Sequence, residues 1–128
     1  MTKTLKTQVA IAGAGPAGLL LSHQLNRAGI SSIVLESRSR TEVERTIRAG
    51  ILEQGTVEVL VETGASDRVL TVGQRHDGIE IRSGTESRRI DFPALCGRSV
   101  WLYPQHEVLT DLIARRLADS GEIGRAHV

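Results

Sequence analysis

The fold is decided by residues 8–29, which read QVAIAGAGPAGLLLSHQLNRAG. The apolar run at residues 8–12 ends at a glycine turn and predicts a short buried strand. After this turn, apolar side chains recur at helical spacing until Gly29 ends the predicted helix. Residues 32–35 predict a second strand, with Glu36 at its carboxyl end. Strand, glycine turn, helix and strand form a βαβ unit, whose crossover we expect to be right-handed.

The glycines of the turn have the spacing G-x-G-x-x-G, at Gly13, Gly15 and Gly18. This pattern indicates a dinucleotide site when a strand precedes it, a helix follows it and an acidic residue comes about 20 positions later. Here Glu36 meets the last condition. Gly13 allows the tight turn, Gly15 lets a pyrophosphate approach the backbone, and Gly18 lets the helix pack closely on the strand. A purely structural turn without a ligand is the alternative interpretation.

Three side chains outside the turn are candidates for dinucleotide binding. A carboxylate at Glu36 can accept hydrogen bonds from two ribose hydroxyls and would repel a 2′-phosphate, which favours FAD or NAD over NADP; alternatively it is only a solvated carboxylate. Arg48 precedes a predicted helix and can form paired hydrogen bonds with a phosphate, or else an ion pair with Glu44. Gln105 follows Pro104 and either caps a helix or faces a ligand.

The rest of the chain predicts an antiparallel excursion between further helices. Residues 37–48 show no clear period and are predicted to form a surface connection. The later predicted elements are a helix that is signalled by apolar residues from Leu52 to Val61 and closes at Gly64, strands at 76–82 and 87–91, an extended segment at 100–103 and a last helix reaching about Ser120.

Composition excludes several classes of protein. The chain has 128 residues, of which 40% are hydrophobic and 24% charged, as in a globular domain. A net charge of +1 is too small for the field of a nucleic-acid or membrane-surface protein, so we expect neither partner. Cys96 is the only cysteine, which favours a reducing cytoplasm. The polar residues 1–8 are not a signal peptide.

The predicted parallel sheet is incomplete. A doubly wound sheet needs about five or six parallel strands, and only two are credible here. Residues 123–128, IGRAHV, match the in-frame translation of a sequencing adapter. We therefore expect residues 1–122 to be the amino-terminal part of an incomplete Rossmann-like α/β domain with an antiparallel excursion, and residues 123–128 to be a non-native tail.

The longer motifs resemble one enzyme family. Residues 7–21 and 33–36, and above all RAGILEQG at 48–55, are similar to the amino-terminal part of the p-hydroxybenzoate hydroxylase family of flavoprotein aromatic monooxygenases. The resemblance continues through residues 89–91 and 103–105. The glycine motif is shared by many flavoproteins, whereas the RAGILEQG segment is much more particular to this family.

The resemblance implies a set of flavin contacts. Thr46 departs from the arginine of the best-known members. The family also uses residues 37–40 to help bind NADPH, and Ser37 departs from the expected arginine, so both NADH and NADPH remain candidates. The implied FAD-binding residues are Gly13, Gly15, Ala17, Gly18, Glu36, Thr46, Ile47, Arg48, Ala49, Gly50, Ile51 and Gln105.

The resemblance also implies an activity for the complete enzyme. NAD(P)H reduces FAD, and one oxygen atom of dioxygen is then transferred to 4-hydroxybenzoate, giving 3,4-dihydroxybenzoate. The residues that hold the aromatic acid lie farther along such chains, so we expect this chain alone to be inactive. A homodimer is a candidate assembly of the complete enzyme. The alternatives are another FAD- or NAD-dependent oxidoreductase and a nucleotide-binding module without catalysis.

Overall fold

The computed structural model describes residues 4–125, which divide into two units. The first unit is built from Met1–Arg48 and Gln105–Val128, and the second from Ala49–Pro104. The candidate residues from Gly13 to Arg48, together with Gln105, belong to the first unit. Within the described range no helix has both the length and the apolar character needed to cross a membrane.

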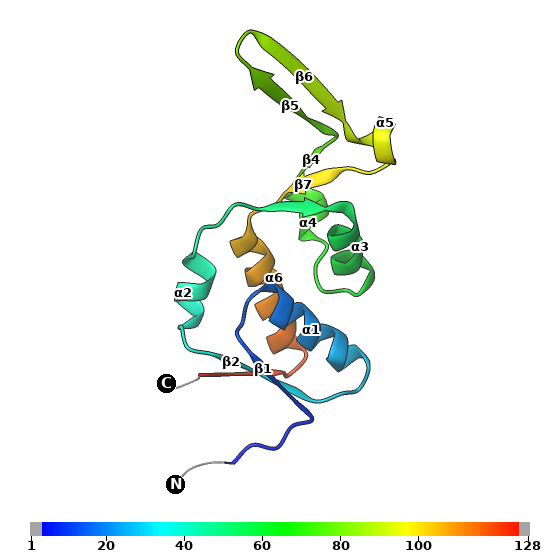
Figure 1. Cartoon of the computed structure of the whole chain (residues 1–128). Coiled ribbons are helices and arrows are strands. Elements are labelled where there is room, and N and C mark those ends of the chain that lie inside the picture. Colours follow the sequence, from blue (N-terminus) through cyan, green and yellow to red (C-terminus); the bar gives the residue numbers. More distant parts are fainter. Residues whose placement is uncertain (1–3, 126–128) are drawn as a thin grey trace. The chain divides into compact units, whose positions relative to one another are not determined.

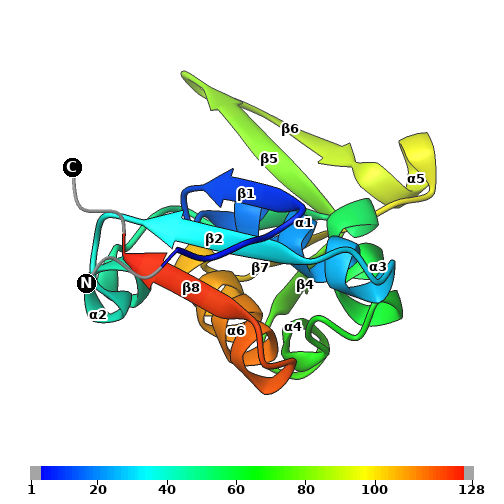
Figure 2. The same ribbon diagram turned by 90° about the horizontal axis from the view of Figure 1, so that it is seen from below.

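A parallel sheet forms the base of the first unit. Its strands are β1 (Val9–Ala12), β2 (Ser32–Glu36) and β8 (Glu122–Arg125), in the order β1-β2-β8 (Figure 2). The predicted βαβ unit is confirmed, since β1 and β2 pair in parallel with Ile11 opposite Val34. Both of these side chains are buried.

The parallel sheet has three strands, whereas the sequence predicted two. β8 pairs with the free edge of β2, which places Val34 opposite Ile123. So short a run has no periodicity that marks it as a strand, and only the open edge of β2 gives its backbone groups partners. Of the stretch predicted to be a non-native tail, residues 123–125 lie in β8 and residues 126–128 lie outside the described residues.

Two helices cover one face of this sheet, α1 (Pro16–Arg27) and α6 (Gln105–Ala118) (Figure 1). Pro16 starts α1 at the position where proline costs no hydrogen bond, and Gly29, at φ +72°, ends the turn that follows it. The aliphatic core of the unit is made of Ile11, Leu19, Val34, Val43, Val108, Leu109, Leu112 and Ile113.

A helix interrupts the predicted surface connection between residues 37 and 48. α2 (Arg40–Arg45) begins with a capping box: the Ser39 hydroxyl accepts from the Glu42 amide at 3.3 Å, and the Glu42 carboxylate accepts from the Ser39 amide at 2.7 Å. Val43 on this helix is 1% exposed. The predicted surface position is confirmed, since most residues from 37 to 48 are exposed. The helix was not predicted, because six residues are too few to show a period, although S-x-x-E marks its start.

The second unit contains the antiparallel excursion, as predicted. β7 (Val100–Leu102) lies between β3 (Ile51–Glu53) and β4 (Gln74–His76). β5 (Gly78–Ser83) and β6 (Glu86–Asp91) form a separate hairpin.

Three helices complete the second unit: α3 (Gln54–Glu62), α4 (Arg68–Thr71) and α5 (Phe92–Cys96). The predicted helix from Leu52 therefore begins later, at Gln54. Leu52 instead pairs with Trp101 between β3 and β7. An apolar residue just before a helix does not reveal by itself whether it continues that helix or pairs in a sheet.

Candidate cofactor-binding site

The glycine turn is hydrogen-bonded to the end of β2. Gly13 has a φ of +101°, which side chains rarely tolerate, and its amide donates to the Leu35 carbonyl at 2.7 Å. The next amide, that of Ala14, donates to Oε2 of Glu36 at 2.9 Å. These two bonds bring the turn and the strand-end carboxylate together, as the sequence predicts for a dinucleotide site.

Gly15 and Gly18 have different surroundings. A Cβ at Gly18 would overlap the Gly13 carbonyl oxygen and stand 3.1 Å from Cγ2 of Ile11, so α1 approaches β1 as closely as it does only because Gly18 has no side chain. A Cβ at Gly15 would meet no atom within 4 Å. The space beside Gly15 is therefore open to a ligand.

The first turn of α1 offers free amide donors. The first bond into the helix runs from the Leu19 amide to the Gly15 carbonyl at 3.0 Å, and Gly15, the N-cap, makes no side-chain capping bond. The turn contains no acidic side chain that would compete for its amides. The amides of Ala17 and Gly18, at the positive end of the helix dipole, can therefore bind an anion.

Glu36 is a buried carboxylate with fixed partners, and only 8% of the residue is exposed. Oε1 accepts from the Arg38 amide at 2.9 Å and from Arg38 Nε at 3.2 Å, while Oε2 accepts from Ala14. Burial by itself would raise the pKa of Glu36, but the hydrogen bonds from Arg38 and Ala14 outweigh it and lower the pKa to about 2. The carboxylate is thus ionised at neutral pH, and it is not the solvated carboxylate of the alternative interpretation.

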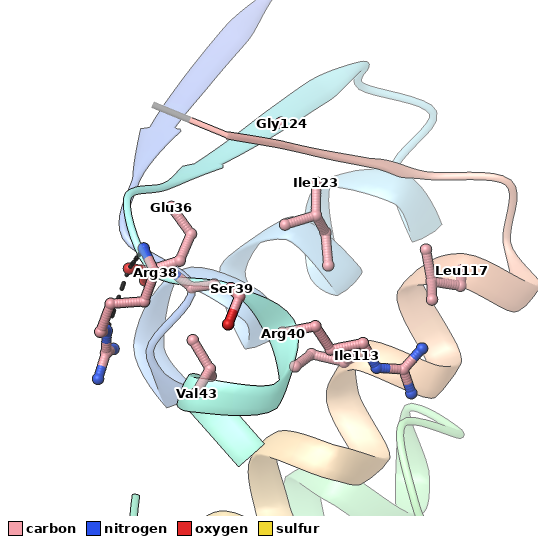
Figure 3. Close-up of a pocket in the computed structure, with 10 residues that line it drawn as sticks. Glu36, Arg38, Ser39, Arg40, Val43, Ile113, Leu117, Ile123 and Gly124 are labelled. Atoms are coloured by element: carbon pink, nitrogen blue, oxygen red, sulfur yellow. Dashed lines mark hydrogen bonds and ion pairs between the residues drawn. The ribbon is translucent and has the colours of Figure 1, made fainter. Parts of the chain in front are cut away.

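A cavity of about 310 Å³ opens beside Glu36 (Figure 3). Its polar side is formed by Glu36, Arg38 and Ser39, and its apolar wall by side chains of α2 and α6. The complete lining is Ala14, Glu36, Arg38, Ser39, Arg40, Val43, Ile113, Leu117, Ile123 and Gly124. A polar rim facing an apolar wall suits a nucleoside, which has hydroxyl groups at one end and a flat base at the other.

A second cavity, of about 200 Å³, lies at the start of α1. It brings together four residues predicted from the sequence, Gly15, Thr46, Arg48 and Gln105, with Arg38 beside them. Gln105 is the first residue of α6. Glu44 pairs with Arg40 at 2.7 Å, not with Arg48 as the alternative interpretation had it. The guanidinium of Arg48 is therefore not committed to that ion pair.

Five further residues that were predicted to bind FAD line neither of these two cavities. Ala17 is exposed in the first turn of α1, and Ile47 is 84% exposed. Ala49, Gly50 and Ile51 begin the second unit, where Gly50 accepts from the Tyr103 amide and Ile51 starts β3. Their flavin contacts remain predictions from the resemblance.

Several residues that line the two cavities were not predicted as FAD contacts, among them Ala14, Arg38 and Val43. Arg38 and Val43 line both cavities. Ala14 contributes a backbone amide, which no side-chain pattern reveals. The signal for Arg38 was its position two residues after the strand-end carboxylate, and the signal for Val43 was the capping box that precedes it.

Known proteins are similar to this chain in sequence and in fold. Residues 6–127 match the family model described as FAD binding domain. The chain is 45% identical over 115 residues to p-hydroxybenzoate hydroxylase of Acinetobacter baylyi, covering 89% of this chain and 28% of that protein. It is 35% identical over 116 residues to 6-methylpretetramide 4-monooxygenase of Streptomyces rimosus, covering 85% of this chain and 27% of that protein.

A solved structure shows the same fold. PqsL of Pseudomonas aeruginosa, in complex with 2-aminobenzoylacetate, superposes with a TM-score of 0.80 and 21% identity over 93% of this chain and 33% of that protein. The chain thus spans between a quarter and a third of the length of these proteins. Because the family model matches nearly the whole chain, the chain belongs to the FAD-binding domain family of the flavin monooxygenases.

Proposed function

We propose that this chain is the FAD-binding part of an NAD(P)H-dependent aromatic monooxygenase that converts 4-hydroxybenzoate to 3,4-dihydroxybenzoate. The observation that carries the proposal is the buried, ionised Glu36, which is held beside the glycine turn and lines the cavity of about 310 Å³. The choice of substrate is supported by the 45% identity to p-hydroxybenzoate hydroxylase and by the RAGILEQG segment.

The residues of the first unit fit FAD. Glu36 would accept hydrogen bonds from ribose hydroxyls, and the apolar wall formed by Val43, Ile113 and Leu117 would take the adenine. The open space at Gly15 would take the pyrophosphate. The free amides of the first turn of α1 and the guanidinium of Arg48 would then stabilise its charge.

Bound FAD would supply the hydride acceptance from NAD(P)H and the reaction with dioxygen. The contribution of this chain is to bind and orient that group. We propose that residues 1–122 are the native amino-terminal part of a longer enzyme and that residues farther along hold the aromatic acid, so that the chain alone has no hydroxylase activity. For the complete enzyme we propose a homodimeric assembly and a cytoplasmic location, the latter supported by the single cysteine among the 128 residues of this chain.

The parent DNA provides the first test. Its sequence downstream of the Ser120 codon should continue with a strand and a long substrate-binding part, and residues 123–128 should be absent from it. A native stop codon directly after the present sequence would refute the proposal that the chain is the start of a longer enzyme.

The complete protein provides the second test. It should purify yellow, with a flavin absorption spectrum, and should oxidise NAD(P)H when 4-hydroxybenzoate is added. Glu36→Arg and Arg48→Ala should each lower the flavin content sharply, because each removes a charge-assisted contact worth about tenfold or more in affinity. Arg27→Ala, at the exposed end of α1, is the matched control. Equal flavin content in all these variants would refute the site, and hydroxylation of another aromatic compound would refute the substrate.

A further inference from the structure

Arg38 holds a position that neither the glycine motif nor the RAGILEQG segment assigns to FAD binding; the resemblance places it only in the stretch 37–40, which helps bind NADPH in that family. It follows the strand-end carboxylate by two residues and lines the cavity beside Glu36 as well as the cavity beside Gly15. Its side chain is 45% exposed, whereas that of Glu36 is 9% exposed. An arginine at the mouth of the site thus reaches inward to a buried acidic group.

The contacts of Arg38 are confined to one oxygen of Glu36. Both its amide and its Nε donate to Oε1, as the dashed lines of Figure 3 show. Within the described part of the chain, Oε2 accepts only from the Ala14 amide. The Ser37 hydroxyl adds a longer bond to Oε1, at 3.4 Å. Since each carboxylate oxygen can accept about two hydrogen bonds, Oε1 is fully occupied by its donors from Arg38 and Ser37, whereas Oε2 keeps one free position.

The burial of Glu36 makes these contacts necessary. Removing a carboxylate from water favours its neutral form, which donates a proton at the place where a ribose hydroxyl needs an acceptor. The positive charge and the two donors of Arg38 oppose that tendency. Arg38 also fixes the rotation of the carboxylate, because its two bonds hold Oε1 at the strand end.

We propose that Arg38 is a positioning residue for cofactor binding, which holds Oε1 of Glu36 so that the ionised Oε2 is presented to the ribose hydroxyls of FAD. This inference rests on the proposed function of the site. It adds that the affinity for FAD depends on a residue that need not touch FAD. Arg38 also determines the pH below which Glu36 becomes protonated and no longer accepts a hydrogen bond from the ribose.

The test compares FAD binding by the 128-residue chain and its variants between pH 8 and about pH 3.5, measured by flavin fluorescence, because the ordinary pKa of the carboxyl is 4.5. The affinity of the unmodified chain should be nearly constant over this range. Arg38→Gln should weaken binding about tenfold at pH 8. Its dissociation constant should then rise further, by up to about tenfold per pH unit, below the raised pKa of Glu36. Arg38→Lys should restore most of the flat profile, and Arg27→Gln is the control.

A second measurement does not need FAD. The side-chain carboxyl carbon of Glu36, followed by NMR through a pH titration, should show a higher pKa in Arg38→Gln than in the unmodified chain and in Arg27→Gln. Circular dichroism at pH 8 checks that the variants are folded, and Arg38→Lys serves as a second variant because it keeps the charge.

The outcomes separate the two proposals. If the unmodified chain binds FAD while Arg38→Gln matches Arg27→Gln in affinity, in pH profile and in the Glu36 titration, the role of Arg38 is refuted and the proposed function stands. If the folded chain binds no FAD at any pH, the proposed function is refuted, and the inference falls with it. A steep pH profile in Arg38→Gln that Arg38→Lys flattens supports the positioning role, since a merely structural role would not move that profile.

Discussion

Gly15 and Gly18 belong to one motif, yet the structure predicts different effects when each is changed to alanine: a loss of stability at Gly18 and a loss of FAD affinity at Gly15. At Gly18 the added Cβ would overlap the backbone oxygen of Gly13, and α1 would have to move away from β1. Overpacking against backbone costs about 3 kcal/mol at the upper end of its range. The higher helix propensity of alanine recovers about 1 kcal/mol. The free energy of unfolding should therefore fall by about 2 kcal/mol.

At Gly15 the backbone is extended, with φ −79° and ψ 175°, which alanine adopts without strain. No heavy atom lies within 4 Å of the added Cβ. Alanine also restricts the unfolded chain, which stabilises the fold by about 0.5 kcal/mol. It is a poorer N-cap than glycine by a similar amount, so the stability of the empty Gly15→Ala chain should stay within about 0.5 kcal/mol of that of the unmodified chain. The same Cβ enters the space proposed for the pyrophosphate, and the affinity for FAD should fall about tenfold or more, which corresponds to about 1.4 kcal/mol.

Urea unfolding followed by circular dichroism measures the first effect, and flavin fluorescence titration measures the second. Each variant is the control for the other, because one changes stability and the other changes binding. If Gly15→Ala binds FAD as tightly as the unmodified chain, the pyrophosphate does not lie against Gly15. If Gly18→Ala unfolds at the same urea concentration as the unmodified chain, the close approach of α1 to Gly13 is not a constraint on the fold.

Two further predictions concern stability. The pKa of Glu36 is about 2 in the folded chain against an ordinary value of 4.5, so the ionised carboxylate stabilises the fold above pH 4.5. This contribution is lost as the pH falls from 4.5 to 2. Lowering the pH from 4.5 to 2 should reduce the free energy of unfolding of the unmodified chain by up to about 3 kcal/mol more than that of the Glu36→Gln variant. If the urea midpoints of the two proteins fall by the same amount over this range, the lowered pKa of Glu36 is contradicted. Ser39→Ala should cost about 1 kcal/mol, because the capping bond to the Glu42 amide is lost, and an unchanged urea midpoint would show that the cap contributes nothing.

Much of the site can be predicted from the sequence because its signals are local. A glycine spacing, a strand before it, a helix after it and a carboxylate at the end of the next strand lie within a single stretch of chain. The helical and strand periods of that stretch do not depend on the rest of the molecule. The same locality explains why the βαβ unit and the antiparallel excursion were predicted correctly.

The errors occurred where the decisive contact is short or distant. α2 has too few residues for a period, although its capping box was readable in Ser39 and Glu42. β8 is a strand because it pairs with the free edge of β2. The sequence of residues 122–125 has no pattern that predicts this pairing. Leu52 lies before a helix but pairs in a sheet, because Trp101 lies opposite it.

The sequence by itself determined the type of fold, the dinucleotide class of ligand and the acidic residue that we propose binds its ribose, because these follow from residue spacing along a single βαβ unit. Only the tertiary structure decided that Arg38 and the Ala14 amide divide the two oxygens of Glu36 between them. It also brought Gln105, distant in the chain, to the cavity of Gly15 and Arg48. Hydrogen bonds and burial depend on distances in space, and the folding of α6 and β8 onto the first βαβ unit sets those distances.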